Sequence, residues 1–226
     1  MRLFYDPLST SSRPVLMFAE EHAVPLELEL VSLVEGAQKR PTYLALNPNG
    51  TIPLLEDGDL RLIESSAILK YLADKVASPS YPLDLKTRAR INATMDWLFG
   101  FHSVFGPGFV YPQMLPQYRH DDPAHQARVL EQGLAATKQR LDVLDAHMIG
   151  PNRNYCCGPE LTLADYMGGS IFSLADAVGF DLSPWPNVAR WVATLKARPS
   201  WVNAHAVFRG MVGAAPPAPA LQGARP

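Results

Sequence analysis

The sequence changes its pattern at residues 77–85, and this change limits the possible folds more than any other feature. Residues 2–76 alternate short apolar stretches, which are typical of strands, with longer stretches in which apolar residues recur at helical spacing. Residues 77–85 carry prolines and read as a linker, and from there on the strand signals stop. We therefore predict an α/β domain over residues 1–76, a linker over residues 77–85 and an all-α domain over residues 86–210.

The first domain shows a distinct order of elements. Strands are predicted at residues 2–5 and 26–31, with a helix that begins near Pro14 between them. A brief helix at residues 41–46 precedes two strands that flank Asp57-Gly58, a dipeptide typical of tight hairpins. A helix over residues 65–75 closes the domain. This order predicts a thioredoxin-like domain, although the sequence has no Cys-x-x-Cys motif.

The second domain is predicted to consist of helices alone. Helical spacing marks residues 88–102 and 124–148, and Gly106-Pro107-Gly108 is expected to kink or stop the first of these helices. Thr162-x-x-Asp165 has the form of a capping box and predicts the start of a helix that runs to residue 177. Further helices are predicted at residues 186–198 and 201–209, and residues 211–226 are expected to form a flexible tail.

The composition excludes several classes of protein. A hydrophobic content of 47% and a charged content of 19% are those of an ordinary globular protein of 226 residues. The formal net charge of −2 gives no electrostatic reason to expect nucleic acid as a partner. No apolar run approaches the roughly 20 residues of a membrane-spanning helix, and the N-terminus does not read as a signal peptide. We therefore expect a cytoplasmic protein without a membrane or nucleic-acid partner.

Cysteine and histidine give no sign of a disulfide or a metal site. Cys156 and Cys157 are neighbours, which are hard to bridge without strain, so buried structural thiols are the simpler interpretation. The histidines have no metal-ligand spacing with cysteines or acids, and we expect no metal.

Four short motifs follow one another in an order that is more informative than any one of them. They are the turn Ser9-x-x-x-Arg13, the pairs Ile52-Pro53 and Glu64-Ser65, and the box Thr162-x-x-Asp165. In this order, and followed by a helical domain, they resemble the motifs of the cytosolic glutathione transferases over nearly the whole chain. The spacing Leu8-Ser9-x-x-x-Arg13 is similar to that of the serine-type theta and delta classes. The resemblance implies the glutathione transferase fold, glutathione as co-substrate and a homodimer.

The resemblance implies that Ser9 acts on the thiol of glutathione. A thiol has a pKa near 8.5 and reacts as its thiolate, and a hydroxyl that donates a hydrogen bond to the sulfur favours the anion. Thr10 and Ser11 are alternatives for this contact. A further alternative is that the hydroxyl cluster only satisfies turn and cap needs, with Ser11 or Ser12 as the cap of the helix. Arg13 is expected to make a structural ion pair.

The next implied contacts are those of the γ-glutamyl and cysteinyl parts of glutathione. Ser65 opens a helix whose N-terminus suits a carboxylate, and Glu64 would bind the ammonium group. The alternative is that Ser65 only caps the helix and Glu64 only complements its dipole. Pro53 is implied to follow a cis peptide bond that turns the backbone of Ile52 toward the cysteinyl part. The alternative is a trans proline at a strand edge.

The glycyl carboxylate of glutathione needs a donor, which the resemblance places ahead of the second helix. Gln38, Lys39 and Thr51 are the predicted contacts there. Gln38 and Thr51 stand where theta-type relatives often have histidine and lysine, so Lys39 or Arg40 is expected to compensate. The alternative is that Lys39 and Arg40 are a solvated surface pair.

The helical domain is expected to supply the pocket for the second substrate. Phe101, Phe105, Phe109 and Tyr111 lie around the predicted helix break, and a cluster of aromatic residues beside the site can form a hydrophobic pocket. The alternative is that most of these side chains belong to the core.

Three functions are compatible with these residues. The first is transfer of glutathione, activated as its thiolate, to a small hydrophobic electrophile. The second is glutathione-dependent reduction of disulfide bonds or peroxides, as in nu-like relatives. The third is a non-catalytic transferase-like binding protein, and the presence of Ser9, Glu64 and Ser65 argues against it.

Overall fold

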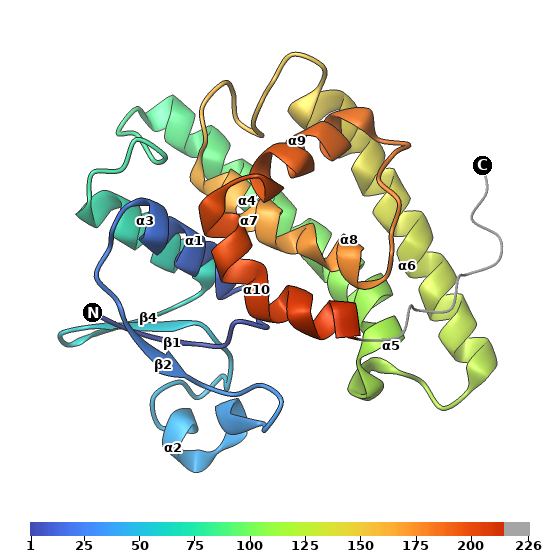
Figure 1. Ribbon diagram of the computed structural model, residues 1–226, viewed down its shortest axis with the longest axis horizontal. Coiled ribbons are helices and arrows are strands. Elements are labelled where there is room, and N and C mark those ends of the chain that lie inside the picture. The colour runs from blue at the N-terminus through green and yellow to red at the C-terminus, as the bar shows by residue number, and fades with distance from the viewer. Residues whose placement is uncertain (215–226) are drawn as a thin grey trace.

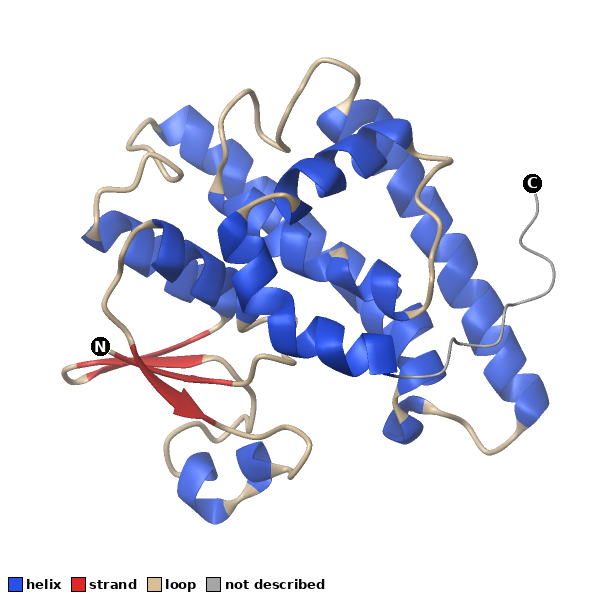
Figure 2. Cartoon of the chain, in the orientation of Figure 1, coloured by secondary structure: helices blue, strands red, loops and turns tan. Residues whose placement is uncertain are grey.

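The computed structural model describes residues 1–214, in which a sheet-containing domain packs against a helical domain (Figure 1). The strands gather at one end of the molecule, and helices fill the rest (Figure 2). The predicted fold class, a thioredoxin-like N-terminal domain followed by an all-α domain, is confirmed. The predicted tail differs in part, because residues 211–214 continue the last helix; residues 215–226 lie outside the described part of the chain.

The sheet has four strands in the order β2-β1-β3-β4. β1 (Arg2–Tyr5) pairs in parallel with β2 (Glu27–Leu30) and antiparallel with β3 (Leu54–Asp57). β4 (Leu60–Ile63) pairs antiparallel with β3, and Gly58 in the connecting turn has a φ of +63°. The hairpin predicted from Asp57-Gly58 is therefore present, and glycine suits its left-handed turn.

Helices cover both faces of the sheet. α1 (Arg13–Glu21), which connects the parallel strands, and α3 (Ser65–Lys75) lie on one face, while α2 (Pro41–Leu44) lies on the other (Figure 1). Side chains alternate along a strand, so Leu3 packs in the large core with α1 and α3. Its neighbour Phe4 packs in a smaller cluster on the side of α2. β1 is thus covered on both faces, whereas the side chains of the edge strand β2 are exposed.

The second domain is entirely helical within residues 1–214, as predicted. α3 ends at Lys75 and the next helix begins at Leu85, so residues 76–84 connect the two helices. The helices are α4 (Leu85–Phe105), α5 (Tyr111–Met114), α6 (Pro123–Val143), α7 (Leu163–Ile171), α8 (Ser173–Ala177), α9 (Pro186–Lys196) and α10 (Pro199–Ala214).

Gly106-Pro107-Gly108 does not stop the chain's helical path. A π-helical turn, η2 (Gly106–Val110), carries α4 directly into α5, because a proline that lacks an N–H is accommodated by a widened turn. The same turn touches α6, where a Cβ atom added to Gly133 would lie 2.0 Å from the carbonyl oxygen of Gly108. Glycine at position 133 therefore allows α6 and η2 to approach each other.

Two other predicted helices are interrupted. The helix predicted for residues 124–148 ends at Val143 and continues as a second π-helical turn, η4 (Leu144–Ile149). The helix predicted to run to residue 177 breaks at Phe172, which separates α7 from α8. The start of α7 follows the prediction, since the Asp165 carboxylate accepts hydrogen bonds from the backbone N–H and the hydroxyl of Thr162, at 2.8 and 2.9 Å.

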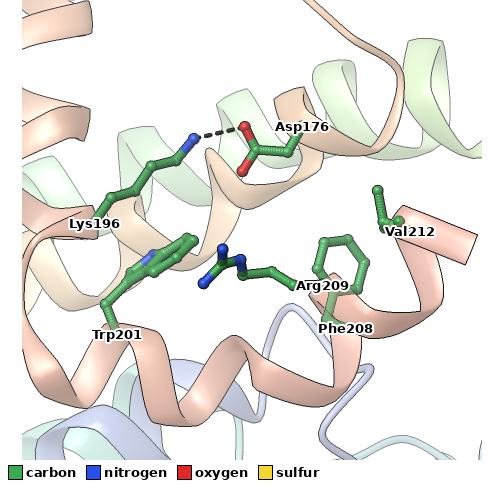
Figure 3. Close-up of a pocket in the computed structure, with 7 residues that line it drawn as sticks. Asp176, Lys196, Trp201, Phe208, Arg209 and Val212 are labelled. Carbon is green, nitrogen blue, oxygen red and sulfur yellow. Dashed lines mark hydrogen bonds and ion pairs between the residues drawn. The ribbon is translucent and has the colours of Figure 1, made fainter.

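α10 packs on α1 and thereby joins the two domains. Its other side borders a hollow of about 430 Å³, into which Trp201, Arg209 and the paired side chains of Lys196 and Asp176 project (Figure 3). Phe208 of α10 lines this hollow and also the larger cavity described below.

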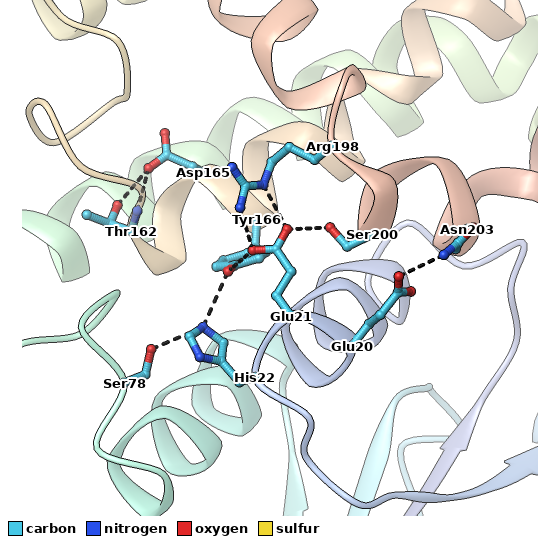
Figure 4. A network of polar contacts seen from close by, with 10 residues as sticks. All are labelled: Glu20, Glu21, His22, Ser78, Thr162, Asp165, Tyr166, Arg198, Ser200 and Asn203. Atoms are coloured by element: carbon cyan, nitrogen blue, oxygen red, sulfur yellow. Dashed lines mark hydrogen bonds and ion pairs between the residues drawn. The ribbon is translucent and has the colours of Figure 1, made fainter.

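A polar network ties the last turn of α1 to the helical domain (Figure 4). The Glu21 carboxylate accepts hydrogen bonds from Nε and Nη2 of Arg198, at 2.7 and 2.8 Å, and from the Tyr166 hydroxyl at 2.6 Å. It also accepts one from the hydroxyl of Ser200. One carboxylate therefore connects the first domain to α7 and to the connection between α9 and α10.

No helix among residues 1–214 is long and apolar enough to cross a membrane.

We predict that Glu21→Gln lowers the free energy of unfolding by about 2 kcal/mol, because the hydrogen bonds that it weakens are charge-assisted. Chemical denaturation measures this change. Glu20→Gln is the matched control, since the Glu20 carboxylate is exposed and accepts one hydrogen bond, from Asn203. Equal effects of the two substitutions would contradict the role given to Glu21.

The effect of Glu21→Gln is also expected to depend on pH. Burial alone would raise the pKa of Glu21, but the hydrogen bonds from Arg198, Ser200 and Tyr166 outweigh it and lower the pKa below its ordinary value of 4.5. A carboxyl group with a lowered pKa contributes stability above its unfolded-state pKa and loses it as the pH falls through its folded-state pKa. The stability difference between the wild type and Glu21→Gln should therefore shrink as the pH falls below about 4.5. A difference that stays constant in acid would be inconsistent with this assignment.

Candidate active site

A turn rich in hydroxyl groups connects β1 to α1, and we call residues 8–12 the serine turn. Its start is fixed by Asp6, whose carboxylate accepts hydrogen bonds from the backbone N–H groups of Leu8 and Leu33, both at 2.7 Å. Asp6 is almost fully buried, at 4% exposure. The serine turn is therefore held to the segment that follows β2.

The hydroxyl oxygen of Ser9 caps the approach to α1. It accepts hydrogen bonds from the backbone N–H groups of Ser11 and Ser12, at 3.2 and 3.1 Å. The sequence predicted Ser11 or Ser12 for this role, but the Ser12 side chain makes no capping hydrogen bond. Two backbone donors already occupy the oxygen of Ser9, so its O–H proton is available to donate elsewhere.

The neighbouring hydroxyl groups have different surroundings. The Thr10 hydroxyl lies 3.4 Å from the Tyr111 hydroxyl and 3.5 Å from a guanidinium nitrogen of Arg13. The Ser11 hydroxyl makes no hydrogen bond within the described residues. The hydroxyl groups of Ser9, Thr10 and Ser11, which look equivalent in the sequence, thus have different surroundings in the structure.

Arg13 lies beneath the serine turn, at the boundary between the domains. Its guanidinium donates to the carbonyl oxygens of Pro7 and Leu8, at 3.2 and 2.7 Å, and to the Ser173 hydroxyl at 2.8 Å. It also lies 4.2 Å from the centre of the Phe208 ring. The predicted ion pair is wrong, because carbonyl and hydroxyl oxygens take the place of a carboxylate. Burial lowers the pKa of Arg13 to about 9, so the group is still a cation at neutral pH.

A cavity of about 510 Å³ opens over the serine turn, and we call it the interdomain cavity. The first domain contributes residues 8–11, Leu33, Val34 and Gln38 to its wall. The helical domain contributes α5 and the residues after it, together with Leu174 of α8 and Phe208 and Met211 of α10. All three predicted hydroxyl groups, those of Ser9, Thr10 and Ser11, border this cavity.

A smaller hollow of about 10 Å³ connects the serine turn to the start of α3. Thr10, Ser11, Ser65, His102 and Phe99 are among the residues that line it. The structure therefore brings Ser65 close to the serine turn, although more than fifty residues separate them in the sequence.

The start of α3 has an unusual backbone. Glu64 precedes the helix with φ 68° and ψ 113°, a conformation that costs a non-glycine residue free energy. Its side chain is exposed and does not cap the helix. Ser65 is the first helical residue, at 8% exposure, and also makes no capping hydrogen bond. The first N–H groups of α3 are thus left without a side-chain partner, which suits a bound carboxylate.

The peptide bond between Ile52 and Pro53 is cis, as the sequence analysis predicted. Thr51 is exposed, and its carbonyl oxygen accepts hydrogen bonds from Tyr43 and Asn47, at 2.7 and 2.8 Å. Within residues 1–214 the backbone N–H and carbonyl of Ile52 have no hydrogen-bond partner, so both can pair with a ligand.

In the segment around the short helix η1 (Ala37–Lys39), some of the predicted residues reach the site and others do not. Gln38 lines the interdomain cavity, and its side-chain oxygen is buried without a partner among the described residues. The Lys39 ammonium lies 3.4 Å from the carbonyl oxygen of Asn49. Arg40 makes an exposed ion pair with Glu35 at 3.0 Å and does not line the cavity.

Most of the aromatic residues predicted to bind the second substrate lie in the core and not in the cavity wall. Phe101, Phe105 and Phe109 are at most 4% exposed and stack on one another in the core, so they do not line the interdomain cavity. Their spacing turns them inward, as the alternative interpretation proposed. Tyr111 does line the cavity, since it begins α5 after the π-helical turn.

Sequence reasoning missed most of the cavity wall in the helical domain. Tyr118 follows Tyr111 closely and was within reach of the same argument. Phe208 and Met211 on α10 carry no signal in the sequence, because they reach the cavity only through the packing of α10 on α1. The missed wall residues are Leu115, Gln117, Tyr118, Leu174, Phe208 and Met211.

No cluster of three or more potential metal ligands occurs among the residues that the structure describes. Cys156 is buried and Cys157 is partly buried, and burial raises the pKa of both thiols. Neither cysteine lines the interdomain cavity.

The thioredoxin-like domain and the helical domain share a cavity over the serine turn. Residues 8–75 match the family model of the N-terminal domain of glutathione S-transferase, and residues 102–199 match that of its C-terminal domain. Human glutathione S-transferase theta-2 is 34% identical over 201 residues, which cover 87% of this chain and 81% of that protein.

Solved structures show the same relationship. Human glutathione transferase theta-2, in complex with glutathione and an unknown ligand, superposes with a TM-score of 0.83 at 32% identity, covering 94% of this chain and 88% of that chain. A delta-class glutathione transferase of Nilaparvata lugens superposes with a TM-score of 0.78 at 31% identity, covering 94% and 96%. The chain belongs to the glutathione S-transferase family: it is a transferase with glutathione as its co-substrate. The family predicted from the sequence is confirmed.

We predict that Ser9→Ala lowers the free energy of unfolding by about 1 kcal/mol, because two backbone N–H groups lose their acceptor. Ser11→Ala is the control and should change stability by less than about 0.5 kcal/mol, because the Ser11 hydroxyl has no hydrogen-bond partner among residues 1–214. Denaturant titration compares the two variants. A larger loss for Ser11→Ala than for Ser9→Ala would overturn the capping role of Ser9.

Proposed function

We propose that this transferase activates the thiol of glutathione as a thiolate at Ser9 and transfers it to a small hydrophobic electrophile in the interdomain cavity. One observation carries the proposal. The oxygen of Ser9 accepts two backbone hydrogen bonds and borders the cavity, which leaves its O–H to donate into the cavity. Thr10 and Ser11 are the alternative donors, and the contacts of Thr10 with Tyr111 and Arg13 make it less available.

The energy required is modest. Lowering a thiol pKa by one unit corresponds to about 1.4 kcal/mol of preference for the thiolate. A hydrogen bond to a charged group contributes about 1.5–3 kcal/mol, so one O–H donor accounts for a shift of that size. The buried cation of Arg13 below the turn favours an anion in the same place. Ser9 in this scheme stabilises the sulfur anion and is itself neither nucleophile nor base.

The remaining contacts of glutathione follow from the same geometry. The free N–H groups at the start of α3 and the Ser65 hydroxyl would hold the γ-glutamyl carboxylate, with the exposed carboxylate of Glu64 near its ammonium group. The backbone of Ile52, after which the cis bond to Pro53 follows, would pair with the cysteinyl part in the manner of a strand. Gln38, Lys39 and Thr51 stay the predicted contacts of the glycyl end.

The wall of the interdomain cavity favours a neutral electrophile. No lysine, arginine, histidine, aspartate or glutamate side chain of residues 1–214 lines it. Methionine and leucine side chains dominate the helical side, with Tyr111, Gln117 and Tyr118 as its polar members. An apolar wall is poorly suited to a second glutathione with its several charges, which argues against the disulfide reductase alternative.

A homodimer in the cytoplasm is the expected setting. Phe99, beside the small hollow, is an apolar side chain with 55% exposure that a second subunit could cover. Sedimentation at micromolar concentration tests the dimer.

We predict that the protein is retained on immobilised glutathione and conjugates glutathione to a chlorinated nitrobenzene faster than it reduces a hydroxyethyl mixed disulfide. Turnover is followed by absorbance. Faster disulfide reduction would contradict the proposal and favour the nu-like alternative.

Ser9→Ala is expected to lower kcat and to raise the pH midpoint of kcat/KM for conjugation, because the bound thiol loses a stabilising donor. Ser9→Thr retains a hydroxyl and should keep most of the activity. The pH profiles of Thr10→Ala and Ser11→Ala serve as controls. A midpoint that moves in one of these controls and not in Ser9→Ala would reassign the donor.

A further inference from the structure

The carboxylate of Asp6 connects two segments of the first domain that both line the interdomain cavity. Its Oδ1 atom accepts the backbone N–H of Leu8, and its Oδ2 atom accepts that of Leu33, both at 2.7 Å. Asp6 follows β1 directly, and Leu33 lies shortly after the end of β2, which runs parallel to β1. One buried carboxylate therefore joins the chain after the first strand to the chain after the second.

On the side of the serine turn, Asp6 fixes the position of Ser9. Besides the side-chain bond to Leu8, the carbonyl oxygen of Asp6 accepts the backbone N–H of Ser9 at 3.0 Å. The carbonyl oxygen of Ser9 in turn accepts the backbone N–H groups of Ser12 and Arg13, both at 3.2 Å, as α1 begins. The hydroxyl group of Ser9 therefore stands on a backbone that Asp6 holds at its start.

On the other side, Asp6 fixes a turn that leads to Gln38. The carbonyl oxygen of Leu33 accepts the backbone N–H of Gly36 at 3.1 Å, and that of Gly36 accepts the N–H of Lys39 at 2.9 Å. Gly36 has a φ of +65°, which a glycine adopts without strain. Gln38 lies within this hydrogen-bonded segment and lines the cavity, so the bond between Leu33 and Asp6 helps to set its place.

Aspartate suits this position because both groups that its side chain meets are donors. An ionised carboxylate has two acceptor oxygens and no donor, so it accepts both N–H groups at once. An asparagine would turn its NH2 group toward one of them, and a buried N–H without an acceptor costs free energy. A serine hydroxyl is one bond shorter and can accept from Leu8, as in a turn of the same kind, without reaching Leu33.

We propose that Asp6 is a positioning residue that acts on two parts of glutathione at once. It sets the hydroxyl of Ser9 against the thiol, and it sets the amide of Gln38 against the glycyl end. Asp6 does not line the cavity and touches neither part itself. The inference rests on the proposed function and deepens it, because activation of the thiol and recognition of the glycine then depend on one side chain.

The test compares glutathione with γ-glutamylcysteine, which carries the same thiol but lacks the glycine. It measures kcat/KM for each thiol with a chlorinated nitrobenzene as the electrophile. Asp6→Asn is expected to lower the value about 25-fold for glutathione and about 5-fold for γ-glutamylcysteine, taking about 5-fold for each weakened hydrogen bond. The thiol without glycine has no glycyl contact to lose, so it is affected through Ser9 alone. Equal losses for the two thiols would overturn the inference.

The pH profile separates the two contacts. Asp6→Asn should raise the pH midpoint of kcat/KM with both thiols, because a displaced Ser9 hydroxyl stabilises the thiolate less. Asp6→Ser keeps the bond to Leu8, so it should leave the midpoint in place and lower the value for glutathione alone, about 5-fold. A midpoint that stays in place in Asp6→Asn, or that moves in Asp6→Ser, would contradict the inference.

Gln38→Ala keeps the inference testable if an Asp6 variant does not fold. It should lower kcat/KM about 5-fold for glutathione and leave both γ-glutamylcysteine and the pH midpoint unaffected. Combined with Asp6→Asn, it should cost glutathione less than the product of the two separate losses, because both substitutions weaken the same contact. Equal losses for both thiols in Gln38→Ala, or independent losses in the double variant, would overturn the inference.

Asp122→Asn is the matched control. The Asp122 carboxylate also accepts two backbone N–H groups, those of Ala124 and His125 at 3.0 and 3.2 Å, but at the start of α6. Asp122 does not line the cavity, so this substitution should leave the ratio of the two thiols and the pH midpoint unchanged. A change in the ratio as large as that of Asp6→Asn would mean that the ratio reports a general loss of stability, and the inference would fail.

Calorimetric titration of the wild type and of Asp6→Asn with each thiol repeats the comparison without turnover. The affinity for glutathione should fall more than the affinity for γ-glutamylcysteine, and equal losses would overturn the inference while the proposed function stands. Binding of glutathione without turnover of the chlorinated nitrobenzene would instead count against the proposed function. No binding of glutathione by the wild type would overturn both.

Discussion

The buried guanidinium of Arg13 is the interaction on which the arrangement of the site depends. It sits at 0% exposure where the two domains meet and donates to the carbonyl oxygens of Pro7 and Leu8 and to the hydroxyl of Ser173. A buried charge is costly unless hydrogen bonds compensate it, so each of these groups is held in place. The serine turn thus has a fixed position relative to α8, and the interdomain cavity has a floor that belongs to both domains.

In this fixed position, the hydroxyl groups of the serine turn have different hydrogen-bond partners. Ser9 caps the backbone that leads into α1, Thr10 contacts Arg13 and Tyr111, and the Ser11 hydroxyl has no hydrogen-bond partner among residues 1–214. The difference arises from which donors surround each oxygen. Three similar side chains in a row can therefore differ in which of them has a proton to offer a thiol.

Local patterns predicted much of the fold and part of the site. Strand β1, helix α3 and the hairpin at Gly58 follow directly from periodicity and turn chemistry, which act over a few residues. The sequence resemblance supplied the cis bond before Pro53. Sequence reasoning misplaced Phe101, Phe105 and Phe109, because a spacing that turns aromatic rings to one side of a helix does not say whether that side meets a cavity or the core. It also missed the π-helical turn η2, whose shape depends on α6 as well as on its own residues.

The sequence by itself determined the order of elements, the division into two domains and the identity of the hydroxyl-rich turn, since propensity and spacing are encoded within each segment. Only the tertiary structure decided which residues surround that turn. Leu33, Tyr111 and Met211 line one cavity although they lie far apart in the chain. The His102 Nε2 atom lies 2.9 Å from the Tyr111 hydroxyl oxygen, and both rings lie beside Gly106. Burial and the direction of a hydroxyl proton depend on neighbours from other elements, and those neighbours are set by packing.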